Sequence, residues 1–256
     1  MEGQSSEKVL NIVIPMAGKG TRFAEAGYAF PKPLIDIKGK AMIEVVVNNL
    51  RPTVPHRFIF ICQREHYEKY DLHNVLKNAT NNHFEVVLVQ GVTEGAACTV
   101  MLAAQYINNN SEMLIANSDQ YIEVSIDDFI VSAREKKSDG LIMTFKASHP
   151  KWSYARTASG GKVLEVAEKK VISDQATVGV YYYKKGSDFM KAAESMIHKN
   201  IRHNNEFYVC PVYNDLILED KDVYVYEIED KKMHGLGTPE DLQMFLKKIE
   251  EEKLVI

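Results

Sequence analysis

The stretch Val9-Leu-Asn-Ile-Val-Ile-Pro15, continued by Met16-Ala-Gly18-Lys-Gly-Thr-Arg22, decides the fold of this 256-residue chain. Its first part is short, apolar and rich in β-branched residues, which predicts a buried strand. Its second part predicts a glycine-containing loop that does not enter a helix at once. Further strands are predicted at 57–62, 85–90 and 112–116, with helices at 41–50, 65–76 and 95–107. Strands that alternate with helices predict parallel pairing in an α/β sheet.

The second half of the chain has a different pattern. Strands are predicted at 140–147, 177–183 and 222–228, and a hairpin over 154–168 turns at Ser159-Gly-Gly161. Ser187 is predicted to cap a helix that runs to residue 200. Thr238, followed by Pro239, predicts the start of a final helix. We therefore expect one domain over residues 1–256, with a mixed, mostly parallel sheet flanked by helices and a small lobe from the second half.

The composition argues against several classes of protein. Hydrophobic residues make up 45% and charged residues 26% of the chain, as in a globular domain. The net charge of −4 does not favour a nucleic-acid or membrane surface. Residues 1–8 lack the pattern of a signal peptide, and no apolar run approaches the ~18 residues that cross a bilayer. Cys62, Cys98 and Cys210 are scattered, odd in number and without metal-ligand spacing, so we expect buried free thiols in a cytoplasmic protein. A homo-oligomer stays open.

The glycine-rich loop has the features of a phosphate site. Glycines let backbone N–H groups approach a phosphate closely. Arg22 offers a rigid fork for phosphate oxygens, and Lys32, stiffened by Pro31 and Pro33, offers a mobile point charge. The spacing of a Walker A loop is absent, and Phe23 stands where a dinucleotide fingerprint needs its third glycine. A tight turn with surface ion pairs is the structural alternative.

At these residues the chain resembles the sugar-phosphate nucleotidyltransferases, the pyrophosphorylases that make activated sugars, and their relatives that make CDP-choline-type compounds. The family's opening motif stands here as Gly18-Lys-Gly-Thr-Arg22 and Pro31-Lys32. The resemblance implies a Rossmann-like (GT-A-like) α/β fold, with a nucleotide-binding half at 9–125 and an acceptor-binding half at 126–256. It implies that an NTP is coupled to a sugar 1-phosphate or a similar small phosphomonoester, with Mg²⁺ and with release of pyrophosphate.

The resemblance also assigns roles to residues of the first half. It implies that the loop backbone and Arg22 hold the β- and γ-phosphates, and that Lys32 lies at the α-phosphate. Segment 90–99 resembles the family's base-binding segment, although a well-packed helix N-terminus capped by Thr93 would use the same small residues. The implied nucleotide contacts are Met16, Ala17, Gly18, Lys19, Gly20, Thr21, Gln90, Glu94, Gly95 and Ser118.

Asp119 and the pair Glu168-Lys169 complete the predicted site. Asp119 follows a buried strand at the ligand-binding edge of the sheet, and Mg²⁺ favours one or two carboxylates, although a turn Asp would look the same. By resemblance, Glu168 accepts hydrogen bonds from acceptor hydroxyls and Lys169 binds the acceptor's phosphate; an exposed, charged hairpin end is the alternative. Gly179 and Tyr208 are further implied acceptor contacts. The predicted catalytic residues are Arg22, Lys32 and Lys169, with Asp119 as the metal ligand.

The chain departs from the family near its C-terminus. Where the family often has a second metal-binding Asp, this chain has Gly235, and His234 is a poor substitute because Mg²⁺ prefers oxygen ligands. The implied partners are an NTP and a small phosphorylated metabolite, without nucleic acid or membrane. A cytidylyltransferase for a non-sugar phosphate, of the phosphocholine or phospho-amino-acid type, stays open. So do a related glycosyltransferase, although Asn117-Ser-Asp119 supplies only one carboxylate, and a non-catalytic nucleotide-binding protein.

Overall fold

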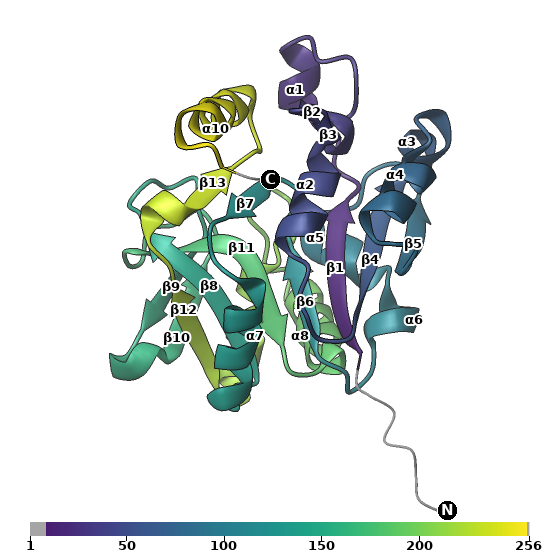
Figure 1. Ribbon diagram of the computed structural model, residues 1–256. Coiled ribbons are helices and arrows are strands. Elements are labelled where there is room, and N and C mark those ends of the chain that lie inside the picture. Colours follow the sequence, from purple (N-terminus) through teal and green to yellow (C-terminus); the bar gives the residue numbers. More distant parts are fainter. Residues whose placement is uncertain (1–8, 255) are drawn as a thin grey trace, which may run out of the picture.

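The computed structural model describes residues 9–254 and 256, and a nine-stranded sheet runs through this part of the chain (Figure 1). The strand order is β10-β9-β11-β6-β1-β4-β5, with β8 beside β11 and β12 beside β8. The strands are β1 Leu10–Met16, β4 His56–Gln63, β5 Phe84–Val89, β6 Met113–Ala116, β8 Gly140–Lys146, β9 Tyr154–Thr157, β10 Val163–Ala167, β11 Gln175–Tyr183 and β12 Val223–Glu227.

The sheet is mixed, as the sequence predicts. Strands β6, β1, β4 and β5 are parallel neighbours, and β12 is parallel to β8. Strand β11 runs antiparallel to β6, β8 and β9, and β9 and β10 form the predicted hairpin. Strand β11 therefore joins strands of the first half to strands of the second half in one sheet, which Figure 1 shows as a change from purple and blue to green.

Helices cover both faces of the sheet. Because side chains on a strand alternate between faces, each strand contributes to a core on either side. In β1, Ile12 and Ile14 pack in one core while Val13 packs in the other. The first core also takes side chains from helices α2 Met42–Asn49, α4 Leu72–Ala79, α7 Ile126–Glu135 and α10 Pro239–Glu252. The second takes them from α5 Ala96–Met101, α6 Ala104–Ile107, α8 Gly186–His198 and α9 Tyr213–Leu218. The predicted α/β class is confirmed.

Several predicted helix boundaries are wrong. The helix predicted at 65–76 is two helices, α3 Arg64–Lys69 and α4, separated by Asp71 at a φ of 50°. The helix predicted at 95–107 is divided into α5 and α6. Ser187 lies inside the first turn of α8, which begins at Gly186. Thr238 does cap α10, since its hydroxyl accepts a hydrogen bond from the Asp241 N–H at 3.1 Å.

The prediction for the loop after β1 is also wrong, because the loop enters a helix at once. Helix α1, Thr21–Glu25, begins directly after Gly20, whose φ of 62° is left-handed. A Cβ at Gly20 would lie 3.3 Å from the Cβ of Lys32, so the two ends of the loop lie against each other. Lys32 opens a short 3-10 helix, Lys32–Leu34, which is followed by the small hairpin β2 Asp36–Ile37 and β3 Lys40–Ala41.

A second small sheet lies beside the ends of β1 and β6. It pairs β7, Gln120–Ile122, with β13, Met233–Gly235. The Leu236 N–H donates to the Asp119 carbonyl at 2.8 Å, so the turn after β6 is tied to the segment before α10. Segments that are more than 100 residues apart in sequence therefore meet at the carboxyl edge of the parallel strands, where α/β sheets bind ligands.

Candidate functional site

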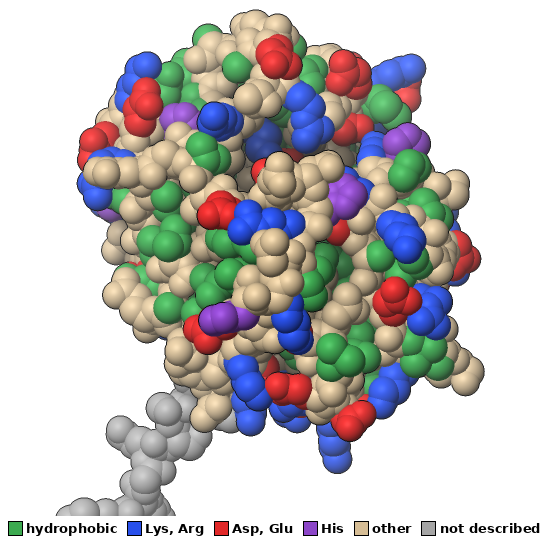
Figure 2. Space-filling model, turned by 180° about the vertical axis from the view of Figure 1, so that it is seen from behind, with side chains coloured by type: hydrophobic (Ala, Val, Ile, Leu, Met, Phe, Trp, Pro, Cys, Tyr) green, Lys and Arg blue, Asp and Glu red, His purple; other side chains and the backbone are tan. Residues whose placement is uncertain are grey.

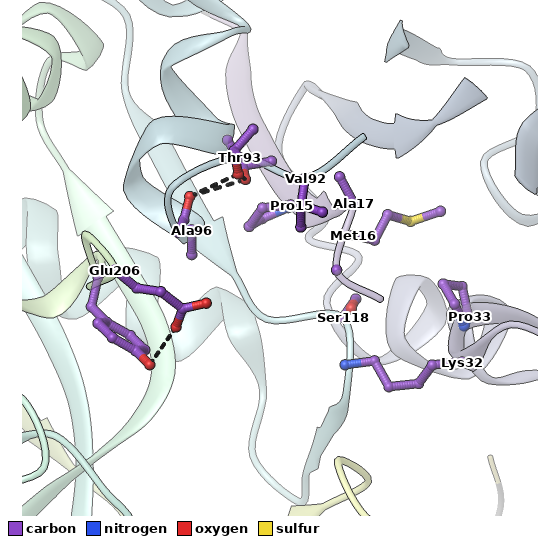
Figure 3. A pocket seen from close by; sticks show the side chains of 14 residues that line it. Pro15, Met16, Ala17, Lys32, Pro33, Val92, Thr93, Ala96, Ser118 and Glu206 are labelled. Carbon is purple, nitrogen blue, oxygen red and sulfur yellow. Dashed lines mark hydrogen bonds between the residues drawn. The ribbon is translucent and has the colours of Figure 1, made fainter. Parts of the chain in front are cut away.

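Three cavities adjoin the carboxyl ends of β1 and β6. We call them the loop cavity, the α5 cavity and the lysine cavity. The loop cavity is lined by residues 18–23 and by Val92, Thr93 and Gly237, among others. The α5 cavity is lined by residues 15–18, the start of α5 and Tyr208 (Figure 3). The lysine cavity extends from Arg22 and Asp119 to Glu168 and Cys210. Lys32 and Glu206 line all three cavities, and in Figure 3 their side chains enter the α5 cavity from opposite sides.

Lys32 and Asp119 form an ion pair where these cavities meet. The Lys32 ammonium lies 2.8 Å from Asp119 Oδ2, and the two side chains are 23% and 25% exposed. Lys32 is held by the 3-10 turn in which the Leu34 N–H donates to the Pro31 carbonyl at 2.8 Å. Because both partners sit on short, hydrogen-bonded turns and are only partly exposed, water screens this pair less than a surface pair.

The lysine cavity carries many charged side chains. It is lined by Arg22, Lys32, Lys151 and Lys169 and by the carboxylates of Asp119, Glu168 and Glu206. Four cations and three carboxylates give a formal charge of +1. By contrast, the face of the molecule in Figure 2 intermixes basic and acidic side chains without a broad patch of one sign. A cleft of net positive charge attracts a polyanion more strongly than such a surface does.

A chain of hydrogen bonds links Lys169, one of the two predicted acceptor-binding residues Glu168 and Lys169, to Glu206. The Lys169 ammonium donates to the Tyr208 hydroxyl at 2.8 Å, and that hydroxyl donates to Glu206 Oε2 at 2.6 Å. Lys169 has a left-handed φ of 50°. The Ser153 hydroxyl donates to Glu168. Burial raises the pKa of Glu168, while the Ser153 hydrogen bond and the charge of Lys169 lower it in part.

The segment of Glu206 is clamped onto the start of α5. The Phe207 N–H donates to the Glu94 carbonyl at 2.7 Å, and the Ala97 N–H donates to the Phe207 carbonyl at 3.0 Å. Gly95 is required here: its φ is 115°, and a Cβ would lie 2.5 Å from the Phe207 oxygen. Thr93 does not cap α5 but hydrogen-bonds with Thr99 at 2.5 Å.

The structure brings most of the predicted residues together. Among the predicted nucleotide contacts, Met16, Ala17, Gly95 and Ser118 line the α5 cavity, Gly18 lines the α5 and loop cavities, and Lys19, Gly20 and Thr21 line the loop cavity. Arg22, Asp119, Glu168, Lys169, Gly179 and Tyr208 line the lysine cavity. Gln90 is exposed and Glu94 pairs with Arg202, and neither lines these three cavities.

Sequence reasoning missed two polar groups near the lysine cavity. Ser153 lines it and holds Glu168. Gln120 is buried, and neither polar atom of its amide has a hydrogen-bond partner among the described residues. A Cβ at Gly179 would collide with Asn117 and with the Gln120 oxygen, 2.5 Å away, so only glycine fits opposite them. No local sequence signal marks either residue.

Asp119 fits a divalent cation in its chemistry but supplies only one carboxylate. The Lys32 ammonium stands in for a cation on its oxygen. A Cβ at Gly237 would lie 2.9 Å from Asp119 Oδ2, so the glycine leaves room beside the carboxylate. Within residues 9–254, no three His, Cys, Asp or Glu side chains converge on a metal site. A cation at Asp119 would therefore take its remaining ligands from phosphate oxygens and water.

Residues near Gly235 do not complete a metal site at Asp119. His234 Nε2 lies 2.6 Å from Glu123 Oε1, and burial lowers its pKa. Asp241 lies beside Gly235, because its Oδ2 atom would be 3.5 Å from a Cβ added at that glycine. Its Oδ1 atom is 3.9 Å from the Lys151 ammonium. His234, Gly235 and Asp241 line a separate cavity with Trp152 and Phe245. That cavity shares Lys151 and Trp152 with the lysine cavity.

Known proteins share both the sequence pattern and the fold. The chain is 25% identical over 258 residues to the bifunctional protein GlmU of Buchnera aphidicola subsp. Schizaphis graminum, covering 97% of this chain. It spans about half (52%) of that relative's length. It is 25% identical over 257 residues to the 2-aminoethylphosphonate cytidylyltransferase of Lancefieldella rimae, covering 96% of this chain and 95% of that protein.

A solved structure extends the likeness to three dimensions. The nucleoside-diphosphate-sugar pyrophosphorylase of Vibrio cholerae RC9 superposes with a TM-score of 0.80 at 26% identity, over 92% of this chain and 99% of that one. Among the described residues, no helix is both long and apolar enough to span a membrane. The model of the nucleotidyl transferase family matches residues 12–252. The resemblance read from the glycine-rich loop is confirmed: the chain belongs to the nucleotidyl transferase family.

Proposed function

We propose that this protein couples an NTP to a sugar 1-phosphate or a similar small phosphomonoester, forming an NDP-activated product and pyrophosphate in a Mg²⁺-dependent reaction. One observation carries the proposal: Lys32 lines all three cavities and contacts Asp119 at 2.8 Å. A nucleotide in the loop and α5 cavities and an acceptor in the lysine cavity would meet at this lysine. Family membership supports the reaction class.

The first half of the chain, 9–125, is the proposed nucleotide site. Backbone N–H groups of the loop and the side chain of Arg22 hold the β- and γ-phosphates. The α5 cavity, whose lining includes Thr93, Gly95 and Ala96, holds the ribose and base. Lys32 lies at the α-phosphate. Arg22 lines both the loop cavity and the lysine cavity, which suits a residue that stabilises the departing pyrophosphate.

The second half, 126–256, is the proposed acceptor site. Lys169 binds the acceptor's phosphate, and Glu168 accepts hydrogen bonds from the acceptor. One donor to Glu168 is the Ser153 hydroxyl, which leaves carboxylate lone pairs for a ligand. Lys169 and Lys32 line the same cavity and would flank the attacking phosphate. Tyr208 positions Lys169 through its 2.8 Å hydrogen bond.

The chemistry asks mainly for charge control. A phosphomonoester has a second pKa near ~6, so its oxygen attacks the α-phosphorus as a dianion without a general base. This dianion must then approach the NTP, which is a polyanion, so Lys32, Lys169 and Arg22 act by positioning and by stabilising charge that shifts in the transition state. Mg²⁺ at Asp119, when bound, would supply further screening of the α-phosphate.

A cytidylyltransferase for a non-sugar acceptor is the second candidate. It is favoured by the end-to-end match with the 2-aminoethylphosphonate cytidylyltransferase, which the chain covers over 95% of its length. Glu168 and Glu206 line the lysine cavity together with the aromatic residues Trp152 and Tyr208, and such a lining would also suit an amino group on the acceptor.

Pyrophosphate release tests both candidates. The purified protein is incubated with Mg²⁺, one of CTP, UTP, dTTP, ATP or GTP, and one of a panel of sugar 1-phosphates, phosphocholine and 2-aminoethylphosphonate. Release that needs one NTP and a sugar 1-phosphate supports the first candidate, and release with CTP and a non-sugar acceptor supports the second. Silence across the panel, in a preparation that binds NTP, would contradict both and favour a non-catalytic nucleotide-binding protein.

A further inference from the structure

In this structure the carboxylate of Asp119 is already paired with a cationic side chain of the protein, Lys32. Its Oδ2 atom lies 2.8 Å from the Lys32 ammonium, and both side chains are about one-quarter exposed. A divalent ion that binds Asp119 must therefore either displace Lys32 or share the carboxylate with it. Sharing places a divalent charge close to an ammonium, and such like-charge repulsion in a partly buried site is strongly unfavourable.

The surroundings of Asp119 discourage a bare cation further. The lysine cavity has a formal charge of +1, from four cationic side chains and three carboxylates. Two of these carboxylates already have partners, because Glu168 accepts from Ser153 and Glu206 accepts from Tyr208. A free divalent cation is repelled by such a field, whereas its complex with a nucleoside triphosphate, which is anionic, is attracted.

We propose that Lys32 closes the metal site of the ligand-free protein, so that the divalent cation enters only together with the nucleotide, and its arrival on Asp119 frees Lys32. This inference rests on the proposed function for its biological meaning. The nucleotide brings the phosphate oxygens that a single carboxylate cannot replace. It also gives the displaced ammonium a new anionic partner, the α-phosphate. Exchange of partners thus places cation and lysine on the nucleotide in one step.

Binding of Mn²⁺ alone, without nucleotide or acceptor, tests this exchange. Free Mn²⁺ is measured by its electron paramagnetic resonance signal during titration of the 256-residue protein. The variants are Lys32→Met and Lys32→Gln, each of which removes the ammonium, and the double variant that adds Asp119→Asn. Lys151→Met is the matched control: it removes another lysine from the same cavity, but one whose ammonium lies near Asp241.

We expect both Lys32 variants to bind Mn²⁺ about tenfold more tightly than the wild type, as befits release of a partly buried ion pair. Lys151→Met should change the affinity by less than about threefold, because it alters only the general field of the cavity. Adding Asp119→Asn should abolish the gain. Near-ultraviolet circular dichroism confirms that each variant is folded.

Equal Mn²⁺ affinity in wild type and both Lys32 variants would overturn the inference. So would an equal gain in Lys151→Met, because general charge would then explain it. The outcome is independent of the proposed activity. A gain in the Lys32 variants without pyrophosphate release in the wild type would sink the activity and keep the closed metal site. Release without the gain would do the reverse.

Discussion

Lys32 is the single side chain on which the proposed reaction depends most. Replacing it by Met should lower kcat by about 100- to 1,000-fold, the usual cost of one electrostatic group that acts in the transition state. KM for the NTP should change little, because the loop backbone and Arg22 remain. Steady-state pyrophosphate release measures both constants. Lys38→Met is the control, since its ammonium pairs with Glu250 outside the three cavities. A drop in NTP affinity with kcat unchanged would assign Lys32 to binding only.

Glu168 should make the stability of the protein depend on pH. Burial raises its pKa in the folded state, so its contribution to stability is present below the pKa of an unfolded glutamate and lost as pH rises through the folded pKa. Glu168→Gln should therefore melt together with the wild type in acid and above it at neutral pH. Calorimetry across a pH series checks this, with Glu165→Gln, a half-exposed glutamate of β10 just before Glu168, as the control. A variant that is less stable at neutral pH would contradict the prediction.

At this scale the sequence located the central pair but not its surroundings. Lys32 and Asp119 follow strands that alternate with helices, so their meeting at one sheet edge could be predicted, and they lie 2.8 Å apart. The sequence analysis predicts a role for Tyr208 but none for Glu206 or Ser153, although both line the lysine cavity. They reach the site through pairings such as that between Phe207 and Glu94, over a hundred residues away, and no local pattern encodes those.

The clamp between α5 and segment 206–208 should be intolerant of a side chain at Gly95. Gly95→Ala adds both backbone strain at a φ of 115° and a Cβ 2.5 Å from the Phe207 oxygen. We expect a loss of about 3 kcal/mol or more in the free energy of unfolding. Gly91→Ala is the matched control: its φ is 76°, but no atom lies within 4 Å of the added Cβ, so about 1 kcal/mol should be lost. Urea titration measures the free energy of unfolding of both variants. Similar losses in the two would mean that segment 206–208 moves to accommodate the added Cβ.

Helix capping offers a second test among the elements. Thr238→Ala removes the hydroxyl that accepts from the Asp241 N–H, and should cost about 1 kcal/mol of unfolding free energy. Ser187→Ala should cost less than about 0.5 kcal/mol, because Ser187 lies inside α8 and its hydroxyl caps nothing. Chemical denaturation compares them. An equal loss in Ser187→Ala would show that the serine stabilises α8 in another way.

The helix boundaries also show where sequence patterns stop being informative. The predicted strands agree closely with the structure, since runs of β-branched and apolar residues lie between turn signals. The break between α3 and α4 falls at Asp71, without glycine or proline to mark it. The small sheet of β7 and β13 was not predicted either. Each of its strands has three residues, too few for a period-2 pattern to stand out.

For the whole molecule, the shared sheet should make the two halves unfold together. Strand β11 of the second half pairs with β6 of the first over four residue pairs. We expect one urea transition whose midpoint is the same by far-ultraviolet circular dichroism and by fluorescence of Trp152, the only tryptophan. The ring centroids of Trp152 and of Phe145 in β8 lie 5.3 Å apart, so the fluorescence of Trp152 reports on the second half. Separate midpoints would show that the halves are independent folding units.

The position of β6 has a consequence for how the protein is made. All four residues of β6 are buried, and its two neighbours are β1, made earlier, and β11, made later. On the ribosome, the growing chain must therefore pass through a stage in which an apolar strand edge has no partner. Such an edge readily recruits strands of other chains. We therefore expect the nascent polypeptide to need a chaperone that covers this edge until β11 is made. Without one, slow translation of the second half should increase the share of aggregated protein.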